Sequence, residues 1–335
     1  MHALSALTLV AALAQAAPAS VRSGKTASPS PATRATKAAA LRMEALQQQV
    51  MLDRAGFSPG VIDGHGGANT AKALAVFQKQ GTAATQRVDT LSRYRITAED
   101  AAGPYVPIPP DMMEKSTLPA LGYASLLEAL AERFHSSPAL LQQLNPGIAF
   151  AADQEIQVPN VHPMILPVQQ PPKDSPPNPA PTPPAAAAPT VHAPAPAKPD
   201  VVITVGKAAR ALTVTNAEGA VVFYAPVTTG SDHDPLPIGE WKVNGVRRNP
   251  TFNYNPELFW DAVETHDKAK IPAGPNNPVG VVWIDISKDH YGIHGTPQPE
   301  AVGRTESHGC VRLTNWDALR LAALVKPGTR VVFTE

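Results

Sequence analysis

The chain has 335 residues, of which 37 are proline and 22 glycine, with 5% aromatic and 17% charged residues. Globular proteins average about 5% proline and about 25% charged residues, so the clustered prolines predict folded units joined by linkers. The 28 Lys and Arg residues balance the 28 Asp and Glu residues, so the net charge is zero. Together with the absence of a long basic block from the sequence, this balance argues against a nucleic-acid binder. The only cysteine, Cys310, excludes an internal disulfide and a zinc site built from several thiolates.

The N-terminus predicts an export signal. Residues 3–17 are apolar and small, and Ala14-Gln15-Ala16 fits the small-x-small cleavage pattern, so we expect residues 1–17 to be a signal peptide. Met1-His2 supplies no basic residue, and a buried N-terminal helix is the alternative. The composition of residues 18–37 predicts disorder. No other apolar run reaches the ~18–20 residues of a membrane-spanning helix, so no membrane span is expected.

Residues 38–103 alternate helical patterns with a glycine-rich turn. We expect a helix around 41–52, a turn at 56–67, and a second helix for which Thr70 is the candidate N-cap. The segment resembles the small three-helix peptidoglycan-binding domain in the order and spacing of Leu46, Leu52, Gly56-Phe57, Ile62-Asp63-Gly64, Gly67, Thr70 and Phe77-Gln78. The resemblance implies an all-α domain that binds the cell wall; a helical packing or dimerisation module is the alternative.

Residues 104–161 form the second expected unit. One helix is predicted around 123–134, and another begins with Ser137 as cap and Pro138 as its first residue. Residues 155–159 alternate like a short strand. The run resembles a LysM-like sugar-binding module, although Asp153-Gln154 replaces the glycine usual before the last strand. This implies a small α+β module that contacts glycan strands; a helical hairpin that only spaces the chain is the alternative.

Residues 162–199 contain 14 prolines and 8 alanines, which predicts a Pro/Ala-rich linker. In polyproline geometry such a segment extends to roughly 120 Å, enough for a tethered domain to search a surface. A ligand for a polyproline-recognising domain is the alternative.

From residue 200 to 335 the pattern becomes β. Short runs rich in β-branched residues predict strands at 201–205, 211–214, 220–224, 239–243, 279–286, 291–294 and 331–333. A hairpin turn is expected at 216–219, and one helix at 315–326. Many short strands with one helix indicate a β-sandwich or barrel.

The groups that carry chemistry lie between residues 294 and 313. A cysteine nucleophile needs an imidazole partner, because only the thiolate attacks. His308 is two residues before Cys310 and aims parallel to it, whereas His294 comes from another strand and can meet the sulfur. Successive N–H groups near Gly309 are candidates for an oxyanion hole. A buried structural cysteine, or zinc held by His294, His308 and Cys310 with His290, are the alternatives.

These residues resemble the catalytic signature of the L,D-transpeptidase (YkuD-type) family. The match consists of Ile293-His294-Gly295-Thr296, Gly303, Ser307-His308-Gly309-Cys310-Val311-Arg312-Leu313 and Asp317, preceded by residues 274–280 and Trp283. It implies a mainly β catalytic domain over residues 200–335, a β-sandwich of mixed sheets with one helix. The whole chain is then multidomain, with this domain preceded by the two small modules.

The resemblance also implies roles for individual residues. Cys310 is the nucleophile, and His294 is its proton acceptor, held by the backbone carbonyl of Gly295. The backbone N–H groups of His308, Gly309 and Cys310 hold the oxyanion. The implied substrate-binding side chains are those of Ser307, His308, Arg312, Thr296 and Asn277, with the planar fork of Arg312 pairing with a substrate carboxylate. No cofactor and no metal are implied.

One loop departs from the family pattern. Leu236-Pro237-Ile238-Gly239 stands where the family has Thr-Pro-x-Gly, and the preceding Ser231-Asp232-His233-Asp234 is unusually charged. We interpret that charged stretch as a solvated loop, with a metal site as the alternative.

The sequence therefore predicts a peptidoglycan L,D-transpeptidase that forms a Cys thioester, secreted to the periplasm or cell wall of a bacterium. Its expected partners are peptidoglycan stem peptides and glycan strands, with a wall-linked protein as a further candidate acyl acceptor, and no nucleic acid. The alternatives are an L,D-carboxypeptidase, an endopeptidase, an inactive wall-binding scaffold and a zinc hydrolase.

Overall fold

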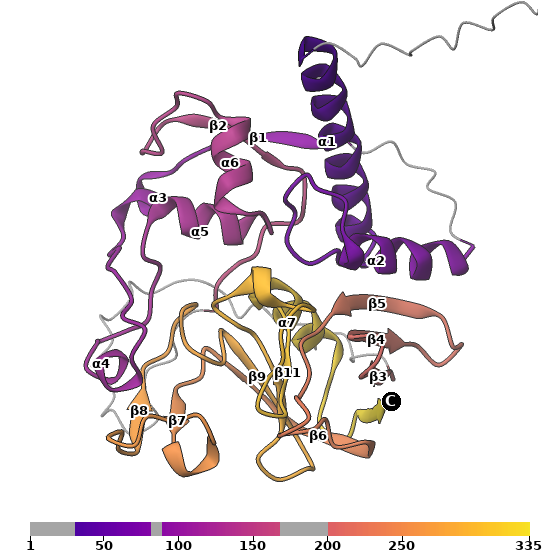
Figure 1. Ribbon diagram of the computed structural model, residues 1–335, viewed down its shortest axis with the longest axis vertical. Coiled ribbons are helices and arrows are strands. Elements are labelled where there is room, and N and C mark those ends of the chain that lie inside the picture. Colours follow the sequence, from indigo (N-terminus) through magenta and orange to yellow (C-terminus); the bar gives the residue numbers. More distant parts are fainter. Residues whose placement is uncertain (1–30, 82–88, 168–199) are drawn as a thin grey trace, which may run out of the picture. The chain divides into compact units, whose positions relative to one another are not determined.

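The computed structural model describes residues 31–81, 89–167 and 200–335 (Figure 1). The expected signal peptide and most of the expected linker lie outside the described residues. The described part of residues 40–335 forms one compact unit. Within the described ranges, no helix combines the length and the apolar character needed to cross a membrane.

The first helix, α1 (Pro31–Arg54), begins earlier than expected. The prediction of disorder up to residue 37 is therefore wrong for its last residues, where proline at the first helical position and alanine favour a helix. The second helix, α2 (Ala68–Lys79), also begins early, with Gly67 and not Thr70 at the N-cap position. The Thr70 hydroxyl lies inside the helix, buried, 3.4 Å from the side-chain amide of Gln49.

A two-stranded antiparallel sheet follows, in which β1 (Leu91–Arg95) pairs with β2 (Glu155–Pro159). Four helices lie between these strands in sequence: α3 (Ala98–Ala102), α4 (Met112–Ser116), α5 (Leu126–Arg133) and α6 (Pro138–Leu144). The expected cap of α6 is present, since the Ser137 hydroxyl accepts from the Leu140 amide and Pro138 comes first.

The strand β1 corrects the all-α expectation for residues 38–103. The boundary predicted between residues 103 and 104 lies between two strands that pair with each other. In addition, Leu46 and Val50 of α1 share one hydrophobic core with Leu130, Leu141 and Ile156. The two segments upstream of the linker are therefore packed together through a common core.

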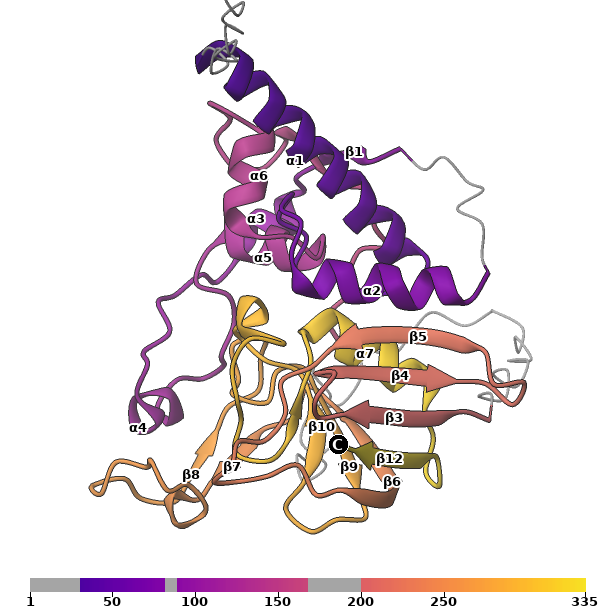
Figure 2. The same ribbon diagram turned by 45° about the vertical axis from the view of Figure 1, so that its right-hand side comes forward.

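The rest of the chain is built on an eight-stranded mixed sheet with the order β11-β10-β9-β6-β12-β3-β4-β5 (Figure 2). Its strands are β3 (Val202–Gly206), β4 (Ala211–Thr215), β5 (Val221–Pro226), β6 (Gly239–Arg248), β9 (Val282–Ile286), β10 (Gly292–His294), β11 (Val311–Arg312) and β12 (Arg330–Thr334). The β10/β11 and β12/β3 pairs are parallel, and the others are antiparallel. The expected hairpin turn is present, because the Asn216 amide donates to the Ala220 carbonyl.

The expected sandwich of separate sheets is corrected to one curled sheet. Strand β6 pairs with β12 through residues 239–242 and with β9 through residues 243–248, and the register shifts between Val243 and Gly245. A strand that bends at such an irregularity serves both halves of the sheet. Helix α7 (Asn315–Leu324) contributes Ala318, Leu321 and Ala322 to the core that the strands enclose.

Two short strands were not expected from the sequence. β7 (Phe252–Tyr254) and β8 (Ala269–Ile271) pair as a small separate sheet, and η1 (Pro256–Leu258), a 3₁₀ turn, lies between them. A second 3₁₀ turn, η2 (Pro299–Ala301), precedes β11. Three-residue strands show too little alternation for a sequence pattern to indicate them.

The upstream segments contact the large sheet directly. The Ser58 amide donates to the Tyr224 carbonyl (2.8 Å) and the Tyr224 amide donates to the Gly56 carbonyl (2.9 Å), so β5 is paired at Tyr224 on its outer edge. The Arg320 guanidinium on α7 also forms two hydrogen bonds, of 2.7 and 3.0 Å, with the carboxylate of Asp53 on α1.

Candidate active site

Two adjacent parallel strands bring the predicted catalytic residues together. In the β10/β11 register, Ile293 lies opposite Val311 and His294 lies opposite Arg312, and Cys310 directly precedes β11. His294, Cys310 and Arg312 line the same cavity, which has a volume of about 880 Å³.

The His294 ring has a defined tautomer. Its Nδ1 lies 2.7 Å from the Gly295 carbonyl oxygen, as the resemblance implies. Because a carbonyl only accepts, Nδ1 carries the hydrogen and Nε2 keeps its lone pair. The ring is 4% exposed and stacks on Trp283, with ring centroids 5.4 Å apart. Burial, with the nearby Arg312 charge, lowers the pKa of His294 to about 3, so the imidazole is neutral at physiological pH.

The Cys310 thiol is half-buried, and its Sγ lies 3.8 Å from the His290 carbonyl oxygen. Burial raises the pKa of the Cys310 thiol, while a hydrogen bond from the Gly292 backbone and the Arg312 guanidinium act in the opposite direction. The resting site therefore holds a neutral thiol and a neutral imidazole. A thiolate forms only when the thiol gives its proton to a base, and the Nε2 lone pair of His294 is suited to accept it.

The turn before the thiol requires glycine at position 309. Gly309 has φ +96°, and a Cβ there would lie 2.5 Å from the Tyr291 ring. Among the described residues, no protein group accepts a hydrogen bond from the amides of His308, Gly309 or Cys310. These three amides are thus available to an oxyanion.

Side chains on both sides hold this turn in place. The Ser307 hydroxyl donates to the Cys310 carbonyl (2.6 Å), and the Ser307 amide donates to the Thr229 carbonyl. Ser307 is buried and does not line the cavity, so the structure gives it a positioning contact and not the predicted substrate contact.

The His308 side chain lines the cavity but faces a loop. Its Nε2 lies 2.8 Å from Asp261 Oδ1, and its ring meets Phe259 edge to face at 5.0 Å. Its Nδ1 is buried without a partner among the described residues. His308 therefore lines the cavity as expected, and its not serving as the base stays a prediction.

Like Ser307, two other predicted substrate-binding residues lie outside the cavity, which corrects the expected placement of all three. Asn277 is fully buried: its side chain donates to the Pro272 carbonyl (2.6 Å) and accepts from the Val279 amide (2.9 Å), so its hydrogen-bonding groups hold a loop. Thr296 is buried, and its hydroxyl accepts from the Gln298 amide.

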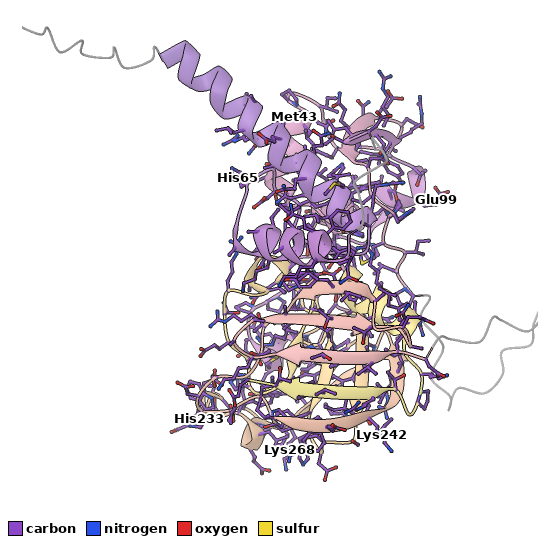
Figure 3. All side chains as sticks on the ribbon, turned by 90° about the vertical axis from the view of Figure 1, so that its right-hand side faces the viewer. Met43, His65, Glu99, His233, Lys242 and Lys268 are labelled. Atoms are coloured by element: carbon purple, nitrogen blue, oxygen red, sulfur yellow. The ribbon has the colours of Figure 1, made fainter. Side chains whose placement is uncertain are left out.

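The remaining expectations concern Gly295 and metal ions. A Cβ on Gly295 would lie 2.2 Å from Asn315 Oδ1, so this position needs glycine for close packing as well as for its carbonyl. Across the ranges that the structure describes, no group of three or more His, Cys, Asp or Glu is placed to hold a metal ion. In the charged loop, the ring of His233, labelled in Figure 3, lies tilted against the ring of Trp260, with centroids 5.0 Å apart.

The sequence reasoning missed several cavity residues. Trp283 was named only as part of the family match and without a role; it lies directly opposite His294 in the antiparallel β9/β10 pair. Tyr291, whose ring packs against Gly309, lies in sequence between His290 and His294, both of which the sequence analysis names as candidates. Asp111 and Met112 also line the cavity, and no pattern linked positions so far upstream to this site.

Alkylation of Cys310 tests the neutral state of the pair. We expect the rate with iodoacetamide to stay low through neutral pH and to rise with an inflection above the ordinary thiol value of 9.0, because burial raises the pKa of the thiol. Alkylation consumes thiolate, so mass spectrometry of samples taken across pH 5–11 reports its fraction. An inflection between pH 5 and 7 would instead indicate a thiolate–imidazolium pair at rest.

Comparison with known proteins identifies the domain that carries this site. Residues 200–333 match the family model of the YkuD L,D-transpeptidase catalytic domain. The chain is 28% identical over 212 residues to a putative L,D-transpeptidase YkuD of Bacillus licheniformis, covering 62% of this chain and 93% of that protein. A Bacillus subtilis relative of the same name is 27% identical over 208 residues, covering 61% of this chain and 91% of that protein. Both alignments are longer than the matched domain, so the similarity extends upstream of residue 200.

Among solved structures, the chain is similar to L,D-transpeptidase 3 from Mycobacterium tuberculosis, with 21% identity and a TM-score of 0.34. That match covers 41% of this chain and 61% of the other. The assignment rests on the match to the family model and on the similarity to the two Bacillus relatives. Residues 200–333 thus match the L,D-transpeptidase catalytic domain of the YkuD family.

Proposed function

We propose that the chain cross-links peptidoglycan stem peptides through a thioester on Cys310. The observation that carries the proposal is the neutral His294, whose Nδ1–H is fixed on the Gly295 carbonyl and which lines the same cavity as a protonated Cys310. This is the arrangement in which a base accepts the thiol proton as the sulfur attacks.

The acylation step uses each of these groups. As the sulfur bonds to the carbonyl carbon of the third residue of a stem tetrapeptide, the thiol proton passes to His294 Nε2. The amides of His308, Gly309 and Cys310 receive the developing oxyanion. Collapse of the intermediate breaks the bond to the terminal D-Ala, which leaves as an amine with the proton from His294.

The second step releases the enzyme. An amine of a neighbouring stem attacks the thioester, His294 accepts the amine proton, and the thiolate leaves and regains that proton. Arg312 lines the cavity, and its guanidinium charge interacts with Cys310 and Asp261. We propose that this guanidinium binds a carboxylate of the substrate.

We further propose that the upstream segments bind the wall and that the protein is secreted. The segment from β1 to β2 supports a LysM-like role, because its two strands pair as an antiparallel sheet and α5 and α6 lie between them in the sequence. On this basis the LysM-like unit begins near residue 89. Binding modules on the same polymer raise the effective substrate concentration at the catalytic domain.

The test is mass spectrometry of products from the full chain incubated with purified disaccharide-tetrapeptide. We expect a cross-linked dimer that lacks one D-Ala. Tripeptide without dimer would replace the proposal with a carboxypeptidase, in which water resolves the thioester. An unchanged substrate, together with a Cys310 that no carbapenem acylates, would favour a wall-binding scaffold.

A further inference from the structure

One wall of the cavity comes from outside the catalytic domain. The segment between α3 and α5, residues 104–122, is called the arm below, and residues 252–271, which contain β7 and β8, are called the flap. The arm contributes Pro110, Asp111 and Met112 to the cavity that contains Cys310. These residues lie about 200 positions upstream of the thiol in sequence.

The arm is anchored by backbone hydrogen bonds next to the flap. The Leu121 amide donates to the Ala273 carbonyl (2.9 Å), and the Asn276 amide donates to the Leu121 carbonyl (3.0 Å). A Cβ on Gly274 would lie 2.0 Å from the Leu121 carbonyl oxygen, so the two backbones are in close contact. Such contacts fix the arm relative to the catalytic domain.

The arm and the flap also share a small hydrophobic core. Leu121 and Ile271 are fully buried there, and Tyr254 is 5% exposed. Met112 on α4 packs against the same cluster, and α4 adjoins β8 (Figure 1). Without the arm, this apolar face of the flap would be exposed to water.

A polar contact joins the two elements beside the cavity. Asp111 Oδ2 lies 2.8 Å from His266 Nε2, and His266 Nδ1 lies 3.1 Å from the Tyr254 hydroxyl. The carboxylate only accepts, so Nε2 carries a hydrogen, and in the neutral ring Nδ1 accepts from Tyr254. Asp111 Oδ1 caps α4 by accepting from the Met113 and Glu114 amides (2.7 and 3.0 Å). One side chain therefore fixes both the start of α4 and the flap.

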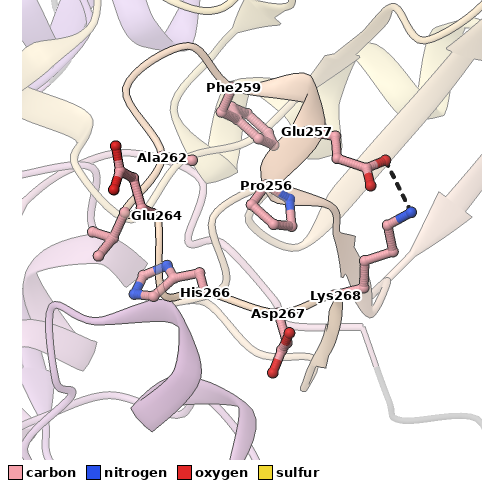
Figure 4. A pocket seen from close by; sticks show the side chains of 9 residues that line it. Pro256, Glu257, Phe259, Ala262, Glu264, His266, Asp267 and Lys268 are labelled. Atoms are coloured by element: carbon pink, nitrogen blue, oxygen red, sulfur yellow. Dashed lines mark ion pairs between the residues drawn. The ribbon is translucent and has the colours of Figure 1, made fainter.

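The flap borders the cavity that contains the thiol. Phe259 and Asp261 contact His308, and a second hollow of about 660 Å³ is lined by residues 256–268 of the same loop (Figure 4). There, Glu257 and Lys268 form an ion pair of 2.9 Å across the loop, and His266 also lines this hollow. A shift of His266 would therefore move the loop that borders Cys310.

We propose that the arm completes the substrate-binding groove, with Asp111 as a positioning residue that fixes the flap through His266. Pro110 and Met112 then form the wall that the peptide of the acyl donor contacts. The inference rests on the proposed function for the identity of that peptide. It means that the catalytic domain alone has an incomplete groove.

The test uses the full chain with Asp111→Ser, which keeps a good N-cap residue but cannot reach His266. Binding of a free stem tetrapeptide is measured by calorimetry in two proteins, Cys310→Ala and Cys310→Ala with Asp111→Ser. We expect the Kd of the second to be about tenfold higher, since a charge-assisted hydrogen bond is lost. With Cys310 present, KM rises by a similar factor while kcat stays within about twofold. Alkylation of Cys310 by iodoacetamide, which needs no groove, keeps its rate.

Two further variants separate positioning from general damage. Glu114→Gln removes a charge from the exposed face of the same helix and should leave Kd and KM unchanged. His266→Leu should weaken peptide binding as Asp111→Ser does. The double variant should bind the peptide no more weakly than the weaker-binding single variant, because both substitutions break the same contact between Asp111 and His266. Additive losses, or a Kd unchanged in Asp111→Ser, would overturn the inference. If the parent chain neither binds nor converts the peptide, the proposed function fails instead.

Discussion

Replacing Cys310 with alanine will abolish dimer formation, with a loss of at least about 10⁴-fold, since no other thiol exists in the chain. His294→Gln will leave the nucleophile in place and lose about 10³-fold or more, because the thiol is protonated at neutral pH and needs the Nε2 base. Dimer and tripeptide from a disaccharide-tetrapeptide are to be quantified by mass spectrometry.

The matched control for the histidine is His65→Gln. The His65 side chain is 54% exposed and lies near α2, outside the cavity, so its loss should leave the rate unchanged (Figure 3). Dimer formation by the alanine variant at the parent rate would show that Cys310 is not the nucleophile. An unimpaired His294→Gln would show that another group accepts the proton.

The second large effect is expected on stability, at Asp53. Its carboxylate is fully buried and contacts two cations or potential cations: the Arg320 guanidinium (2.7 and 3.0 Å) and His135 Nδ1 (3.0 Å). Despite burial, His135 and Arg320 hold the pKa of Asp53 well below its usual range. Asp53→Ala leaves His135 without its partner and leaves Arg320 with only the longer 3.8 Å contact to Asp317, so it should cost about 3 kcal/mol.

Urea unfolding of the full chain, followed by tryptophan fluorescence, measures this loss, because Trp316 stacks on His135 with ring centroids 5.2 Å apart. Arg93→Gln provides the control: its pair with Glu155 is exposed, and its removal should change the free energy of unfolding by at most about 1 kcal/mol. Equal stability of Asp53→Ala and Arg93→Gln would mean that the contact between α1 and α7 adds nothing in solution.

This contact changes the view of how the chain is organised. The proline-rich composition of residues 162–199 suggests independent modules on a long spacer. In the structure, the segments before the spacer pair with β5, reach α7 through Asp53, and supply the arm to the groove. Fixed contacts of this kind restrict the search that a long linker would otherwise permit.

The local features were predicted well where a short pattern determines them. Ser137 and Pro138 start α6 as expected, and the strands at 202–206 and 211–215 lie within about a residue of the prediction. Strand β6 was predicted too short. Asn244 and Gly245 look like the end of a strand, yet the irregularity there lets β6 continue and change its partner from β12 to β9.

For this protein, the sequence predicted the catalytic chemistry through the family resemblance of the residues around His294 and Cys310, because residue types and spacing alone also allowed a structural cysteine or a zinc site. The two residues are close in sequence and come from neighbouring strands, so the signature that carries the resemblance is a local one. Only the tertiary structure decided that Asn277 and Thr296 hold loops, that one curled sheet replaces a sandwich, and that Asp111 borders the groove. The physical reason is that strand alternation and helix caps depend on neighbouring residues. A contact such as Asp111 with His266 depends instead on how distant segments pack, and no local pattern records it.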